Sequence, residues 1–210
     1  MSLQRLTRAA AVLAALFCVS CSLAGGERAA KNAPTVADTG PSPAVMADYS
    51  AALSAVQAGD DAAAERALQA LSVAHPELAG PLLNLALLRM RQGDEAAARD
   101  YFEKASAVCT NCAPVWNGLG VLYRQQGQFS ESERAYLKAV ELDAGYALAY
   151  YNLAVLYDLY IQRPELALVN YQQYLSLAAD DSNADVERWI ADLRRRVSAM
   201  PTTARAEGAT

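Results

Sequence analysis

The side chains with the most distinctive chemistry in this 210-residue sequence are four cysteines and a single histidine. Cys109 and Cys112 form a Cys-x-x-Cys pair, a spacing that occurs in disulfides, haem attachment, metal sites and redox motifs. Haem attachment needs a His after the second Cys, where this chain has Ala113. Zinc needs two further ligands, which are absent nearby, and a thioredoxin-like motif needs a βαβ context. We therefore expect a small-loop disulfide that stiffens a turn, with two free thiols as one alternative and a redox or metal role as another.

Catalysis by an ionisable base has little support in this sequence. His75 stands beside Pro76 at the end of a predicted helix, which favours a surface loop residue over a catalytic base. We find no Gly-rich phosphate loop, nucleophile motif or cluster of metal ligands. The sequence therefore predicts a protein that is not an enzyme and holds no cofactor or metal. Its net charge of −5 and lack of a basic stripe argue against a nucleic-acid partner.

The elements that position these residues follow a period of 34. Residues 116–143 read as two amphipathic helices joined by a turn at Gly127, and one such unit cannot bury its own apolar face. The unit recurs in several independent columns of the sequence. These columns are Gly59, Gly93 and Gly127; Leu85, Leu119 and Leu153; Ala52, Ala86, Gly120 and Ala154; Ala64, Ala98 and Ser132; Leu68, Phe102 and Tyr136; and Leu71, Ala105 and Ala139.

This unit resembles the tetratricopeptide repeat, whose pattern is W-x2-L-G-x2-Y, then A-x3-F, then P. Its matching residues are Trp116, Leu119, Gly120, Tyr123 and Tyr136, whereas Ser132 and Ala144 stand where the pattern has Ala and Pro. The resemblance implies an all-α protein, an α-solenoid of about four helix-turn-helix repeats over residues 45–181.

We place the repeats at 45–78, 79–112, 113–146 and 147–181. The fourth repeat has one extra residue, and Gln162–Arg163–Pro164 replaces its turn glycine. An amphipathic segment at 183–198 is expected to be a capping helix, because terminal repeats need a polar outer side. Residues 199–210 are expected to be a disordered tail.

The N-terminal residues are typical of a secreted lipoprotein. Residues 1–20 carry Arg5 and Arg8, then an apolar run that is too short to be a permanent membrane span. Cys21 after Ser20 resembles the bacterial lipobox, although Cys18 stands where the usual residue is Leu. We expect a signal peptide at 1–20, lipidation of Cys21, and a flexible tether at 21–43 that is rich in Ala, Gly, Pro, Ser and Thr. The resemblance implies palmitate on Cys21 and a site on the periplasmic face of the outer membrane. An ordinary secreted protein or a retained anchor is the alternative.

A stripe on the first helix of each repeat is the best candidate for binding. By the geometry of the family it faces a concave groove. The stripe comprises Tyr49, Leu53 and Val56; Leu83, Leu87 and Met90; Asn117, Val121 and Arg124; and Tyr151, Val155 and Asp158. Its apolar character suits a partner's amphipathic helix or an extended apolar peptide. The chain's own tail or a second copy in a homo-oligomer are alternative occupants. The clamp of Lys, Asn and Arg that some relatives use for a C-terminal carboxylate is not recognisable.

The resemblance implies a scaffold for protein–protein interactions in assembly of the Gram-negative envelope. The chain is similar to tetratricopeptide lipoproteins that serve as pilotins for type IV pilus secretins. It is also similar to those that bring peptidoglycan hydrolases to their regulators. A redox-responsive periplasmic carrier that uses Cys109 and Cys112 is the alternative from a different class.

Overall fold

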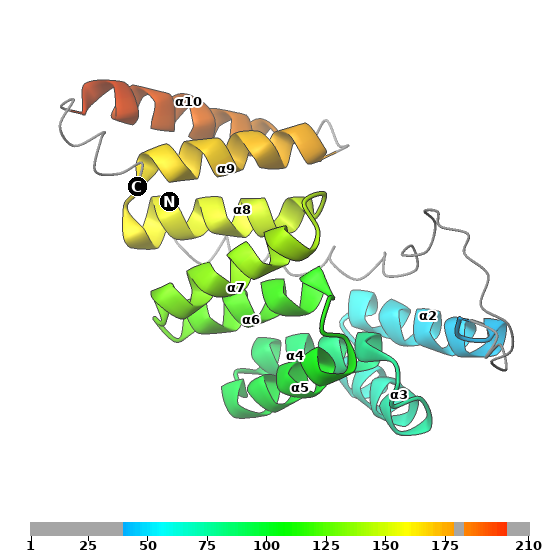
Figure 1. Ribbon diagram of the computed structural model, residues 1–210. Coiled ribbons are helices and arrows are strands. Elements are labelled where there is room, and N and C mark those ends of the chain that lie inside the picture. Colours follow the sequence, from blue (N-terminus) through cyan, green and yellow to red (C-terminus); the bar gives the residue numbers. More distant parts are fainter. Residues whose placement is uncertain (1–39, 179–182, 201–210) are drawn as a thin grey trace, which may run out of the picture.

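The computed structural model describes residues 40–178 and 183–200, and every regular element in these two ranges is helical (Figure 1). Helix α2 (Pro43–Ala58) packs on α3 (Asp61–Ala74), α4 (Ala79–Gln92) on α5 (Glu95–Val108), and α6 (Ala113–Gln125) on α7 (Phe129–Leu142). Helix α8 (Ala147–Val155) continues into a π-helix, η2 (Leu156–Ile161), and packs on α9 (Pro164–Leu177). A last helix, α10 (Ala184–Ala199), packs on α9. The predicted all-α solenoid of helical pairs is confirmed.

Glycine ends the first helix in three of the four pairs. The φ angles of Gly59, Gly93 and Gly127 are +75°, +81° and +72°, a left-handed conformation that costs glycine almost nothing. Asp60 and Asp94 then begin the second helices, because their carboxylates accept the N–H groups of Ala63 and Ala97 at 3.0 and 3.1 Å. The 34-residue column of glycines is therefore a column of helix ends.

The fourth pair accommodates its extra residue in η2. A π-helix holds one more residue per hydrogen-bonded turn than an α-helix, so the insertion lengthens the first helix without breaking it. The left-handed position that glycine occupies in the other pairs is taken by Gln162, with φ +58°. Pro164 then begins α9, where its missing N–H leaves no bond unmade.

The two helices of a pair approach closely where a glycine faces an aromatic ring. A Cβ built on Gly120 would lie 2.5 Å from the ring of Tyr136, which is itself fully buried. Ser132, which stands where the repeat pattern has Ala, is also buried and donates its hydroxyl to the Gly120 carbonyl at 2.8 Å. The Ser132 hydroxyl, which replaces the Ala of the repeat pattern, therefore has a hydrogen-bond acceptor inside the core.

Helix α10 closes the C-terminal end of the array. Val186, Ile190 and Leu193 are buried in one cluster with residues of α8, η2 and α9. Arg196 Nη1 donates to Asp158 Oδ1 at 2.5 Å, which ties α10 to η2. The helix begins at Ala184 and ends at Ala199, one residue later at each end than the predicted range of 183–198.

Candidate functional site

All twelve residues of the predicted stripe lie on the first helices of the four pairs. They fall on α2, α4, α6 and α8, with Asp158 in η2. Helix α4 contacts α6, and α6 contacts α8, so the stripe crosses neighbouring helices. Along the chain, α3, α5 and α7 lie between consecutive first helices, and α9 follows the last of them (Figure 1). The stripe is therefore one face shared by several repeats.

The stripe residues differ in how far solvent reaches them. Leu83, Asn117 and Val155 are buried, with exposed fractions of 8%, 6% and 8%. The other nine are half-buried, including Leu53, Leu87 and Val121. A partner can therefore contact these nine directly, whereas the three buried residues belong to the packing beneath them.

Side-chain hydrogen bonds join first helices of neighbouring repeats along this face. Asn84 Nδ2 donates to Tyr49 Oη at 2.7 Å, and Asn152 Nδ2 donates to Asn117 Oδ1 at 2.8 Å. Both bonds connect residues 35 apart in the sequence. Asn84 and Asn152 are buried polar residues that the predicted stripe did not include. Asn84 and Asn152 are separated by two repeat periods in the sequence, and this spacing could have identified them.

Of the two charged residues in the stripe, Arg124 is the one that has no oppositely charged partner among the described residues. Its guanidinium carbon lies 5.7 Å from the centre of the Tyr160 ring. Its Nη1 is buried without a hydrogen-bond partner, and no carboxylate in the described ranges forms an ion pair with it. Asp158, the other charged residue of the stripe, is paired with Arg196. The stripe therefore presents one unpaired positive charge on a chain whose net charge is −5.

An aromatic cluster adjoins Arg124 at the C-terminal end of the stripe. The ring of Tyr151 lies 6.0 Å from Tyr171, 5.2 Å from Tyr174 and 6.4 Å from Trp189. Burial raises the pKa of Tyr151 and Tyr171, while the nearby Arg124 charge opposes that rise. These hydroxyls are therefore neutral at physiological pH and offer hydrogen bonds without charge.

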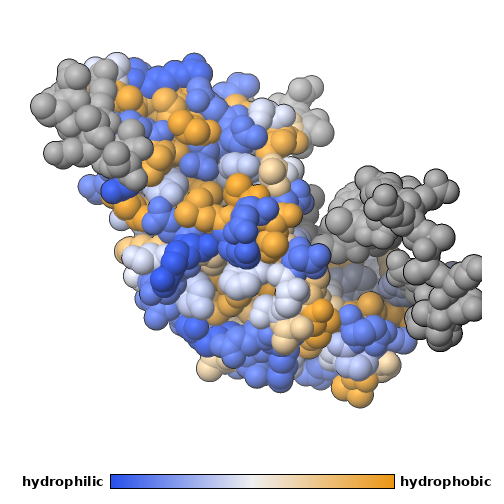
Figure 2. Space-filling model, viewed as in Figure 1, coloured by the Kyte–Doolittle hydropathy of each residue, from blue (hydrophilic) through white to orange (hydrophobic). Residues whose placement is uncertain are grey.

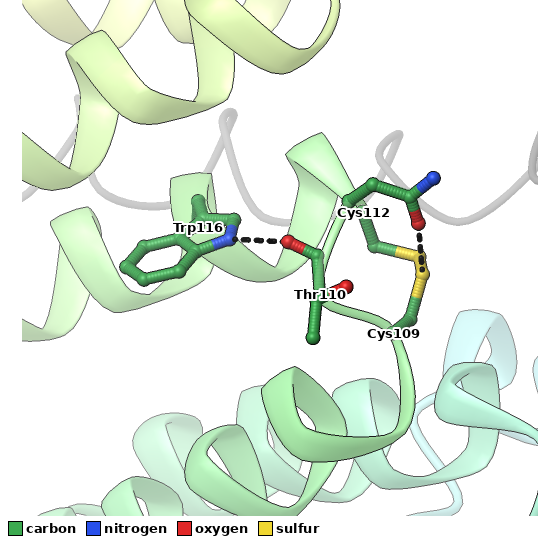
Figure 3. Close-up of a disulfide and its surroundings, with 5 residues drawn as sticks. Cys109, Thr110, Cys112 and Trp116 are labelled. Atoms are coloured by element: carbon green, nitrogen blue, oxygen red, sulfur yellow. Dashed lines mark hydrogen bonds between the residues drawn. A yellow bond between two sulfur atoms is a disulfide. The ribbon is translucent and has the colours of Figure 1, made fainter.

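The two cysteines of the Cys-x-x-Cys pair form a disulfide in the link between α5 and α6. Cys109 follows the last residue of α5 and Cys112 precedes the first residue of α6, with their Cα atoms 5.5 Å apart. Figure 3 shows Trp116 beside this link, with its indole N–H donating to the Thr110 carbonyl at 3.4 Å. Both cysteines are half-buried.

The remaining candidates for chemistry lie apart from the stripe. His75 caps the end of α3, and its Nδ1 lies 3.2 Å from Glu77 Oε1. A shallow open hollow next to it is lined by Pro41, Ser42 and Val45. In the described ranges, no three His, Cys, Asp or Glu side chains are grouped to hold a metal ion.

Two properties of the described ranges concern contact with membranes: the length and apolar character of the helices, and the distribution of hydrophobic residues on the surface. None of the described helices combines the length and the apolar character that crossing a bilayer requires. On the face shown in Figure 2, hydrophobic residues form separate patches between hydrophilic ones. The predicted signal peptide at 1–20, the lipidated Cys21, most of the tether at 21–43 and most of the tail at 199–210 lie outside the described residues.

Residues 77–145, which span the second and third helical pairs, match the family model of the tetratricopeptide repeat. The fold is a tetratricopeptide-repeat solenoid. A comparison with curated protein sequences finds no match.

Three solved structures illustrate the likeness. PilF of Pseudomonas aeruginosa is 23% identical, with a TM-score of 0.66, over 74% of this chain and 69% of that one. The tetratricopeptide protein TTC0263 of Thermus thermophilus is 23% identical, with a TM-score of 0.61, over 71% and 80% of the two chains. The first tetratricopeptide domain of Spaghetti (RPAP3), bound to the HSP90 peptide SRMEEVD, is 18% identical, with a TM-score of 0.53, over 58% and 96%.

Proposed function

We propose that this chain is a non-enzymatic scaffold that binds a segment of a partner protein along the first-helix stripe. The observation that carries the proposal is the repetition of half-buried apolar side chains on consecutive first helices: Leu53, Leu87 and Val121. Such side chains gain free energy when a partner covers the solvent-accessible part that remains. The fold supports the proposal, since a related solenoid is known with a bound peptide.

The polar features of the stripe narrow the chemistry of the partner segment. Arg124 is partly buried without a counter-ion, which is unfavourable for a charge in a desolvated position. An acidic group on the partner would supply that counter-ion beside the neutral hydroxyl of Tyr151. We therefore expect a segment with apolar side chains for repeats two and three and one acidic group near Arg124.

We further propose that the scaffold works in envelope assembly and is tethered to the outer membrane through lipid on Cys21. The lipobox-like residues before Cys21 and the likeness of the fold to PilF support this proposal. Within this setting we favour pilus or secretin biogenesis. An adaptor for peptidoglycan hydrolases is the second candidate, because it would use the same stripe with a different partner.

Site-specific photocrosslinking in cells tests where the partner binds. A photoreactive amino acid at Leu87 should give covalent adducts, which mass spectrometry of the purified adduct would identify. The same amino acid at Val73, an apolar residue on α3 that is 81% exposed, is the matched control because it lies off the stripe. Adducts at Val73 with none at Leu87 would contradict the proposal, and adducts of the chain with itself would identify a homo-oligomer as the occupant.

A further inference from the structure

The three links between consecutive repeats share one backbone conformation. They run over His75–Leu78, Cys109–Cys112 and Asp143–Tyr146. In each, the first residue donates its N–H to the preceding helix, at 2.8, 2.9 and 3.0 Å. The φ and ψ angles of these first residues are −133° and 68°, −128° and 92°, and −146° and 97°. The last residues are similarly extended, at −95° and 114°, −88° and 101°, and −76° and 84°.

The middle link differs from its two neighbours in carrying a covalent bond. In the outer links the last N–H donates to the first carbonyl, from Leu78 to His75 and from Tyr146 to Asp143, both at 3.1 Å. In the middle link a disulfide joins the same two positions. The corresponding hydrogen bond, from the Cys112 N–H to the Cys109 carbonyl, is not formed in the middle link, so the disulfide stands in its place. The outer links show that a hydrogen bond between these two positions supports the same shape. The middle link can therefore keep its conformation with the disulfide open by forming that hydrogen bond.

The surroundings of the two sulfur atoms suit both redox states. Thr110 and Asn111 between them are exposed, so a thiol can approach from solvent. Asn111 Oδ1 lies 3.4 Å from Cys109 Sγ, a position from which it would accept the S–H of a reduced Cys109. Cys112 directly precedes α6, a helix of 13 residues whose positive N-terminal end favours a thiolate. Reduction thus leaves each sulfur with a favourable neighbour.

We propose that Cys109–Cys112 is a thiol–disulfide exchange site whose substrate is a dithiol. One thiolate of the dithiol attacks Cys109 Sγ and forms a mixed disulfide, and Cys112 leaves as a thiolate beside the N-terminal end of α6, whose partial positive charge favours the negative sulfur. The second thiolate of the dithiol then attacks the sulfur of the first and releases Cys109. The disulfide of this chain gains two electrons and two protons, and the dithiol loses both and becomes a disulfide.

The exchange does not require the repeats to move. Trp116 of α6 holds the link through the Thr110 carbonyl, a contact that involves neither sulfur atom. Because a hydrogen bond between the same two positions maintains this geometry in the outer links, we expect α6 to keep its place in the solenoid when that bond replaces the disulfide. The site is thus separate from the scaffold proposed above, which would bind its partner in either redox state.

Thiol trapping in the folded protein tests the proposal. The full chain with Cys18→Ser and Cys21→Ser would be treated with excess dithiothreitol, quenched with acid and labelled with a maleimide that shifts its mobility on a gel. We expect both remaining thiols to be labelled in buffer without denaturant, with an unchanged helical circular dichroism spectrum. A disulfide that resists dithiothreitol until urea is added, or a helical signal that is lost on reduction, would overturn the proposal.

A second variant separates loss of the disulfide from effects of the reductant. Adding Cys109→Ser and Cys112→Ser to the same chain removes the covalent bond without dithiothreitol. We expect this chain to keep the helical spectrum and to unfold in a single cooperative transition. A chain that is unfolded in native buffer would show that the link needs its disulfide, and the exchange site would be excluded.

Discussion

At the scale of single residues, the solenoid depends on contacts between very small and very large side chains. Gly120 has no side chain, so the ring of Tyr136 lies directly against its backbone. The columns at period 34 include both positions, with Gly120 in the column of small residues and Tyr136 in the column of large ones. They did not predict that Ser132 would satisfy its hydroxyl on the Gly120 carbonyl, because that bond depends on the distance between two helices. Local spacing indicates which residues face a partner helix but not how closely the helices approach.

Replacing Gly120 with Leu should destabilise the fold by roughly 1–3 kcal/mol or more, because the added atoms overlap the buried Tyr136 ring. Urea denaturation followed by circular dichroism would measure the change. Gly40→Ala is the matched control, since a Cβ at Gly40 meets nothing within 4 Å. A Gly120→Leu chain as stable as the parent would contradict the pairing of α6 with α7.

The hydroxyl of Tyr136 should make stability depend on alkaline pH. Burial raises its pKa from 10.0 to about 12, so the folded state keeps the proton that the unfolded state loses. The contribution is present below pH 10 and is lost as the pH rises towards 12, by up to roughly 2–3 kcal/mol. Tyr136→Phe keeps the ring and removes the proton, so its unfolding free energy should fall less over this range. Equal losses in the two chains would show that Tyr136 does not carry the effect.

At the scale of elements, the helices follow from the sequence and the irregular segment does not. The glycine column identified the ends of three first helices, and those glycines adopt the left-handed conformation. The extra residue of the fourth repeat was visible as a change of period. Nothing local indicated that it would be absorbed as a π-helix, or that Gln162 would take the glycine position. The π-helix makes two contacts with distant segments of the chain: Tyr160 packs on Phe129, and Asp158 pairs with Arg196.

Gln162→Gly should stabilise the chain by about 0.5 kcal/mol. The left-handed conformation costs a non-glycine residue about 1–2 kcal/mol, and the substitution removes this cost. Glycine also has more conformational freedom in the unfolded chain, which reduces the stabilisation by about 0.4–1 kcal/mol. Gln172→Gly, at an exposed position in the interior of α9, should instead destabilise by about 1 kcal/mol. Thermal melts of the two variants beside the parent would show opposite shifts; a lower melting temperature for Gln162→Gly would contradict the assigned turn.

Packing between first helices also explains why three residues of the predicted stripe are buried. Spacing along one helix selects residues on one side of it, but neighbouring first helices cover some of that side. Leu83, Asn117 and Val155 are covered in this way, whereas Leu87 stays accessible. The asparagine bonds across the stripe, at Asn84 and Asn152, arise from the same neighbouring helices and could not be derived from one repeat alone.

At the scale of the whole molecule, the proposed lipid anchor would hold the solenoid near a membrane. The proposed lipid on Cys21 would attach the chain to the membrane, with the first-helix stripe available to a partner. The stripe's single unpaired charge and its apolar residues would then act together on one bound segment. Anchoring and binding are separate properties, so each has its own test.

Cys21→Ala should abolish metabolic labelling with palmitate and move the protein out of the membrane fraction. The thioether that would carry the lipid cannot form without the cysteine sulfur. Cys18→Ala, three residues earlier, is the matched control and should leave labelling intact. Palmitate incorporation that persists in the Cys21→Ala chain would exclude this lipidation site.

The most direct test of the scaffold is the affinity of Leu87→Asp for the partner captured by crosslinking. A partner that buries about 100 Å² of apolar surface on Leu87 gains about 2.5 kcal/mol there, at about 25 cal/mol per Å². The aspartate removes this gain and adds a carboxylate that must lose water, so the Kd should rise at least about 50-fold, since 1.4 kcal/mol is tenfold. A circular dichroism melt must show that the variant is folded, and Val73→Asp, off the stripe, should bind like the parent. A folded Leu87→Asp chain that binds this partner with unchanged affinity would contradict binding along the first-helix stripe.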